Sequence, residues 1–159
     1  MDAVDLLLRA FDGARRHPWE SIESAATDLS PAEAAWQPPA YGQEVHDDGV
    51  GRPGTILWHL NHLAHCHRHY AAILRNRPAE GQPETPPPGE LGLDRVLPAL
   101  EASCEALRVE IARLATGDLS SPCTASSDVA GFVLAFIRHL TWHGAQIRQT
   151  RRLWSRRTA

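Results

Sequence analysis

Four long segments of the chain place an apolar residue every three or four positions, which is the spacing of one buried face on an α-helix. They run from residue 4 to about 17, from 55 to 75, from 93 to about 114 and from 128 to 157. No segment competes by alternating apolar and polar residues, as a half-buried strand does. The pattern therefore predicts an all-α fold, a four-helix bundle to which each long segment contributes one helix.

Length and composition fit one folded unit. The chain has 159 residues, and 43% of them are hydrophobic, which is enough to bury one sizeable core. We therefore expect residues 1–159 to form a single domain.

Proline and capping residues predict helix boundaries in the first part of the chain. Pro18 marks a kink or an end of the first long helix. In the stretch DLSPAEAAW, Ser30 can cap a helix, Pro31 suits its first position and Glu33 follows the cap by three residues. A short helix should therefore begin there and end before the prolines that open the next segment.

Two connectors lack helical periodicity. Residues 38–54 are rich in glycine, proline and aspartate and should form a long loop, which in a compact domain often carries function. Residues 76–90 are rich in proline, and their length favours a long crossover connection over a tight turn. In the helix that follows, Pro98 is expected near the first turn, and Gly117 is expected to end it.

The cysteines and the N-terminus bear on the compartment. Cys66, Cys104 and Cys123 are odd in number and form no CxxC motif, so free thiols are expected rather than a disulfide framework. No apolar run approaches the roughly 18 residues of a membrane span, and acidic residues stand where a signal peptide has basic ones. The sequence predicts a cytoplasmic protein that does not enter a membrane.

The C-terminal end is rich in arginine. The arginines without acidic neighbours are Arg138, Arg148, Arg151, Arg152, Arg156 and Arg157. Such side chains can contact phosphates, but near the end of a helix they also complement its dipole. Because no nucleic-acid-binding motif accompanies them, nucleic-acid binding is not expected.

The last helix carries two histidines four residues apart, His139 and His143. They share the apolar stripe with Phe132, Phe136 and Ile147, so both should face the core. Buried imidazoles need hydrogen-bond partners or a metal ion. Spacing alone leaves open whether these two bind a metal or hydrogen-bond to groups on other helices.

The second helix carries many more histidines than one site needs: His59, His62, His65, His67 and His69. Periodicity places His59 and His67 within the apolar side and His62 near its edge. The pattern favours His59 as a ligand, with His62 close behind. Cys66, one turn after His62, is a weaker candidate for a soft ligand.

Two motifs resemble those of a known family. The stretch TILWHLNHLA, which begins at Thr55 and contains His62, is similar to the second-helix motif of the DinB-like superfamily. The stretch HLTWHGAQI resembles its last-helix motif of a histidine, three residues, a histidine, two residues and a glutamine. The order of the parts agrees as well, so the resemblance extends over nearly the whole chain.

The resemblance implies a four-helix bundle that binds a divalent metal ion through three histidines. Carried over by motif, these are His62, His139 and His143. The other histidines of the second helix would then not be ligands. His59 stays open as the alternative third ligand, because periodicity favours it.

Three neutral imidazoles leave one position of the ion open, as in catalytic sites. Zinc is the expected ion and nickel the alternative. An ion of this kind lowers the pKa of a bound water or thiol. The family includes thiol-dependent transferases that use low-molecular-weight thiols, and proposed hydrolases. We expect a metal-dependent thiol transferase, with a hydrolase or a non-catalytic, dimerizing bundle as alternatives.

The sequence assigns neither a substrate nor a catalytic residue. No acid belongs to the two histidine motifs, which favours thiol transfer because a bound thiol needs less help from a base than water does. The loop before the second helix offers three acids and a histidine as candidate bases, Glu44, Asp47, Asp48 and His46. Trp36, Tyr41 and Trp58 are candidates for the walls of a pocket, and an exposed face of the bundle is a candidate homodimer interface.

Overall fold

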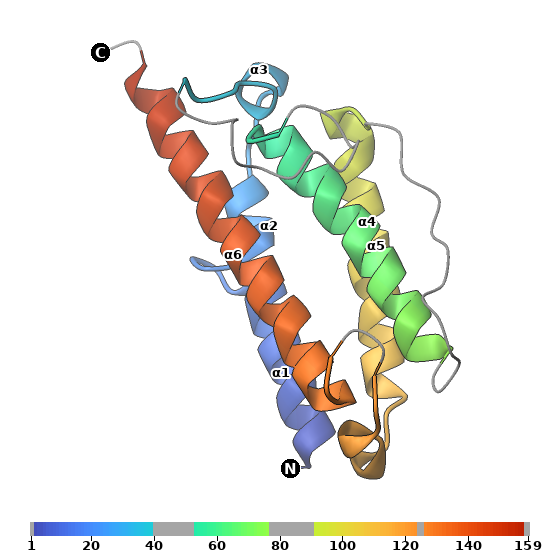
Figure 1. Cartoon of the computed structure of the whole chain (residues 1–159). Helices are drawn as coiled ribbons and strands as arrows, with labels where there is room; N and C mark the ends of the chain where they lie inside the picture. The colour runs from blue at the N-terminus through green and yellow to red at the C-terminus, as the bar shows by residue number, and fades with distance from the viewer. Residues whose placement is uncertain (1, 40–52, 77–90, 124–125, 158–159) are drawn as a thin grey trace.

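The computed structural model describes residues 2–39, 53–76, 91–123 and 126–157, and these form a helical bundle (Figure 1). The helices are α1 (Ala3–Arg16), α2 (Ile22–Ala26), α3 (Pro31–Ala34), α4 (Ile56–Arg75), α5 (Leu93–Ala112) and α6 (Val129–Arg156), with the 3-10 helix η1 (Thr116–Ser120) before α6. The described residues contain no strand. The predicted all-α fold is confirmed.

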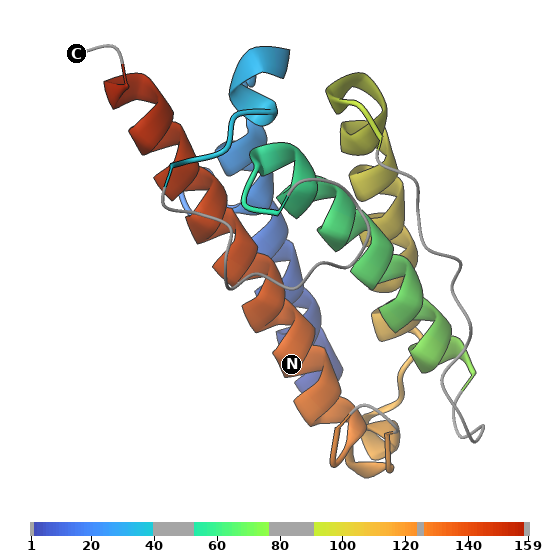
Figure 2. The same ribbon diagram turned by 45° about the horizontal axis from the view of Figure 1, so that its top comes forward.

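The four long helices form a closed ring in which α1 packs against α6, α6 against α4, α4 against α5, and α5 against α1. Helices α1 and α6 run in one direction, and α4 and α5 run in the other (Figures 1 and 2). Helix α4 therefore ends, and α5 begins, at opposite ends of the bundle. These helix directions are the ones that the expected crossover between the second and third long helices requires, and the connecting residues 77–90 lie outside the described ranges.

Side-chain caps mark the start of each described α-helix except α5, which begins after Gly92 without one. The Ser30 hydroxyl accepts a hydrogen bond from the Glu33 amide at the start of α3, as predicted. At the start of α4 the Thr55 hydroxyl accepts a hydrogen bond from the Trp58 amide, and at the start of α6 the Asp128 carboxylate accepts one from the Gly131 amide. Helix α1 ends at Arg16, before Pro18, and the chain starts a separate helix, α2, instead of continuing. Each start is thus a local property of the sequence.

Two details of the third long helix differ from the prediction. Helix α5 ends at Ala112, and Gly117 lies in η1 rather than at the end of α5. Pro98 lies in the second turn instead of the first. Its missing N–H leaves the Asp94 carbonyl without a helical partner, but both residues are exposed, so water can satisfy that oxygen.

The core contains an aromatic cluster beside the histidine-rich part of α4. Phe11 of α1 meets Phe136 of α6 edge to face at 6.1 Å between ring centroids, and Tyr70 of α4 stacks on Phe136 at 5.6 Å. Phe132 contacts both Tyr70 and Phe136. Such pairs add to the stabilisation from burial, so they fix α4 and α6 relative to each other.

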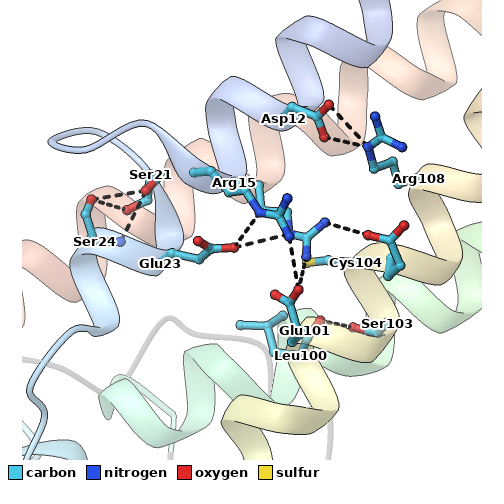
Figure 3. Close-up of polar contacts among 12 residues, drawn as sticks. Asp12, Arg15, Ser21, Glu23, Ser24, Leu100, Glu101, Ser103, Cys104 and Arg108 are labelled. Carbon is cyan, nitrogen blue, oxygen red and sulfur yellow. Dashed lines mark hydrogen bonds and ion pairs between the residues drawn. The ribbon is translucent and has the colours of Figure 1, made fainter.

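A buried arginine links α1 to α5. The Arg15 side chain is fully buried and pairs with Glu23, Glu101 and Glu105, and Figure 3 shows its guanidinium directed at the first two carboxylates. Burial lowers the pKa of Arg15, but the hydrogen bonds that its guanidinium donates to Glu101 and Glu105 outweigh this and raise the pKa above the ordinary value. The charge is therefore retained inside the bundle.

None of the helices within the described ranges is long and apolar enough to cross a membrane.

Candidate metal centre

Helices α4 and α6 face each other with a pair of potential metal ligands on each. On α4 these are His62 and Cys66, and on α6 they are His139 and His143. Residues four apart on a helix lie on the same side, one turn from each other, so each pair points in one direction. Since α4 and α6 pack together, the two pairs meet between the helices.

The ring nitrogens of the three motif histidines come close together. Nε2 of His139 lies 3.2 Å from Nε2 of His62 and 2.9 Å from Nε2 of His143. A tetrahedral zinc ion with bonds of about 2.0–2.1 Å holds two nitrogen ligands about 3.3 Å apart. The Cys66 Sγ lies 3.4 Å from Nε2 of His62, and the ligand atoms of His62, Cys66 and His139 are all within 4.8 Å of one another. The donor set therefore fits a divalent metal ion.

The imidazoles of His139 and His143 are held in the neutral form that binds metals. Burial, together with the nearby His62, lowers the pKa of His139 to about 4. Burial and the neighbouring histidines also lower the pKa of His143 well below its ordinary value. Neutral imidazole offers a lone pair, whereas imidazolium does not. At neutral pH these ring nitrogens are thus ready to act as ligands.

The comparison with known families matches this arrangement. A family model described as the DinB superfamily matches residues 16–147, a range that includes both histidine motifs. The chain belongs to the DinB superfamily. No curated protein and no solved structure matches the chain. The resemblance seen in the two motifs is therefore confirmed at the level of the superfamily.

Within this DinB-superfamily bundle, His59 contacts the side of His143 that faces away from His139. It is fully buried, and its Nδ1 lies 2.7 Å from Nδ1 of His143, whereas Nε2 of His143 faces His139. Burial lowers the pKa of His59 to about 3. One of the two Nδ1 atoms must donate and the other accept, so His59 supports the orientation of His143.

The remaining histidines of α4 are spread around the helix. His67 is buried in the core, where its Nδ1 lies 3.3 Å from Sγ of Cys104, and burial lowers its pKa to about 3. His65 and His69 are half-buried. Periodicity predicted the burial of His67 correctly.

Two tryptophans pack against the imidazoles. Trp58, one of the predicted pocket residues, is buried and stacks on His62 with ring centroids 5.0 Å apart. Trp142 meets His143 edge to face at 4.7 Å, and half of its surface is exposed. Trp36 instead packs against Trp154 on α6. Trp142 was not identified from the sequence, although it directly precedes His143 in the last-helix motif.

Several candidates from the loop lie outside the described residues. These are Tyr41, Glu44, His46, Asp47 and Asp48. Among the described residues, a pocket of about 210 Å³ lies between α2 and α5 and is lined in part by Arg15 and Cys104. It includes none of the motif histidines. The candidate centre therefore rests on the converging nitrogens.

Proposed function

We propose that this DinB-superfamily protein binds one divalent metal ion through His62, His139 and His143 and is a metal-dependent enzyme of the thiol-transferase type. The observation that carries the proposal is the convergence of three Nε2 atoms from two facing helices, with neighbouring nitrogens 3.2 and 2.9 Å apart. Zinc is the favoured ion and nickel the alternative, because imidazole accepts both. His59 is not needed as a ligand, since it contacts the opposite side of His143.

An ion held by three neutral imidazoles lowers the pKa of a thiol that binds it, which yields a nucleophile at neutral pH. Other side chains of the protein hold the ligand imidazoles in the protonation state and orientation that metal binding requires. His143 must keep Nε2 free of a proton to serve as a ligand, so its Nδ1 carries the proton and donates a hydrogen bond to Nδ1 of His59. Trp58 covers one face of His62 and restricts the rotation of that ring.

The composition of the cluster favours thiol chemistry over hydrolysis. The group formed by His62, Cys66 and His139 contains a thiol and no carboxylate. A hydrolase needs a base to accept a proton from the attacking water, whereas a bound thiol loses its proton more readily. The substrate we propose is therefore a low-molecular-weight thiol together with a small electrophilic acceptor.

The test is thiol consumption by the metal-loaded protein. Wild-type protein loaded with zinc or with nickel is mixed with a small thiol and an electrophilic aromatic halide, and the loss of free thiol is followed over time. We expect turnover that is abolished by chelation and by His139→Ala, and that is unchanged in the control His69→Ala. Hydrolysis of activated esters without thiol consumption would support the hydrolase alternative, and tight metal binding without either reaction would support a non-catalytic bundle.

A further inference from the structure

Cys66 is placed to be a ligand of the same centre. It lies one turn after His62 on α4, is only half-buried, and has its Sγ 3.4 Å from Nε2 of His62. Its Sγ and the ligand nitrogens of His62 and His139 lie within 4.8 Å of one another. Cys66 is thus part of one cluster with two of the motif histidines, His62 and His139, although it is not one of the three ligands that the family motifs imply.

The separation of sulfur and nitrogen is the one that a shared ion imposes. Zinc bonds of about 2.3 Å to sulfur and 2.0–2.1 Å to nitrogen, set at the tetrahedral angle, separate the two ligand atoms by about 3.5 Å. The observed 3.4 Å between Cys66 Sγ and His62 Nε2 agrees with this value. Helices α4 and α6 would then each supply two ligands, four residues apart.

The surroundings of Cys66 differ from those of a cysteine that only fills the core. Cys104 is almost fully buried, and burial raises the pKa of its thiol to about 12, so it stays protonated. Cys66 instead lies among imidazoles at the partly exposed side of the cluster. Tyr70, one turn further along α4, forms a hydrogen bond with Cys66. A phenol that stays protonated can donate to a thiolate and stabilise it.

We propose that Cys66 is the fourth protein ligand of the metal centre and keeps the fourth position closed until a substrate thiol competes for it. This inference rests on the proposed function. When Cys66 binds, its thiol releases a proton to the solvent and binds as thiolate. When a substrate thiol takes the position, that thiol loses a proton and Cys66 regains one, so no electron is transferred. Soft thiolates compete with Cys66 more effectively than water does, which makes Cys66 a selector for thiol substrates.

Cobalt substitution provides a test that does not depend on activity. Metal-free wild-type protein is titrated with Co²⁺ and its absorption spectrum is recorded, alongside Cys66→Ser, Cys66→Ala and the control Cys123→Ser. A thiolate bound to cobalt gives a charge-transfer band in the near ultraviolet, whereas the visible ligand-field bands report cobalt binding by any ligand set. Circular dichroism establishes that each variant is folded.

We expect the charge-transfer band in the wild type and in Cys123→Ser, and its loss in both Cys66 variants, which should keep their ligand-field bands. Adding mercaptoethanol to cobalt-loaded Cys66→Ala should restore the band, because the position is then open. Ligand-field bands without a charge-transfer band in the wild type would overturn the role of Cys66 and leave the three-histidine site in place. The absence of both kinds of band from the wild type would overturn the proposed function together with this inference.

Discussion

His59 and His143 form a pair of buried imidazoles joined through their Nδ1 atoms, 2.7 Å apart. Residues that orient a metal ligand in this way typically contribute about 10–100-fold to metal affinity. We therefore expect His59→Leu to weaken zinc binding by about that factor while the protein still binds one ion at saturation. Competition with a chromogenic chelator measures the affinity, and His69→Ala serves as a control that should bind as the wild type does. If His59→Leu bound no zinc at saturation, His59 would be a ligand.

His67 makes the stability of the metal-free protein depend on pH. Burial lowers its pKa from the ordinary 6.5 to about 3, so below pH 6.5 the unfolded chain binds a proton that the folded chain does not. Stability is full above pH 6.5 and falls as the pH decreases toward about 3, by up to about 1.4 kcal/mol per pH unit for one histidine.

Replacing His67 should therefore flatten this pH dependence. We expect the free energy of unfolding of His67→Leu to fall less steeply than that of the wild type between about pH 6 and pH 4, by up to about 1.4 kcal/mol per pH unit. Urea unfolding of metal-free protein at several pH values measures the slope. Equal slopes for the two proteins would mean that His67 is protonated in the folded state.

The sequence could predict which histidines are buried but not how they pair. Periodicity places His59, His67 and His143 on apolar faces, and all three are buried. Periodicity also favours His59 over His62 as a metal ligand, because it reports only which side of a single helix is buried. Which ring nitrogens meet depends on how α4 packs against α6, which periodicity does not describe: Nε2 of His62, at the edge of its apolar face, lies 3.2 Å from Nε2 of His139.

At the level of the helices, the cap of α4 should contribute measurably to stability. The Thr55 side chain is buried, and its hydroxyl accepts a hydrogen bond of 3.0 Å from the Trp58 amide. We expect Thr55→Ala to lower the free energy of unfolding by about 1 kcal/mol, as is typical for a lost N-cap. Thr55→Ser keeps the acceptor and should retain most of the stability. Chemical denaturation of the two variants measures the difference, and an equal loss in both would assign the effect to the methyl group.

Helix starts were easier to predict from the sequence than helix ends. Ser30 and Asp128 are capping residues directly before an apolar periodic segment, and both cap helices in the structure. The end of α5 carries no comparable signal. Its cap residue, Arg113, keeps a right-handed helical backbone, and Leu114 is buried although it lies beyond the helix. Apolar residues at helical spacing therefore continue past Ala112, where α5 ends, and for this reason the sequence predicted that the helix ends at Gly117.

For the whole molecule, the core should keep the bundle folded without metal. Each long helix contributes a fully buried side chain, for example Phe11, Leu60, Leu107 and Leu140. Because burial of such side chains is the main source of stability, we expect chelation to leave the helical circular dichroism signal at 25 °C unchanged. The melting temperature should fall by several degrees, because an ion that binds only the folded state stabilises it. Loss of the helical signal on chelation would indicate a structural metal instead.

The central claim is that His62, His139 and His143 together hold one metal ion, and metal content tests it most directly. Elemental mass spectrometry of untagged protein after reconstitution compares the wild type with His62→Ala, the double variant His139→Ala/His143→Ala and the control His69→Ala. We predict close to one equivalent of metal in the wild type and the control, and almost none in the other two. A wild type without metal after reconstitution, or retention of the metal in His62→Ala, would contradict the three-histidine centre.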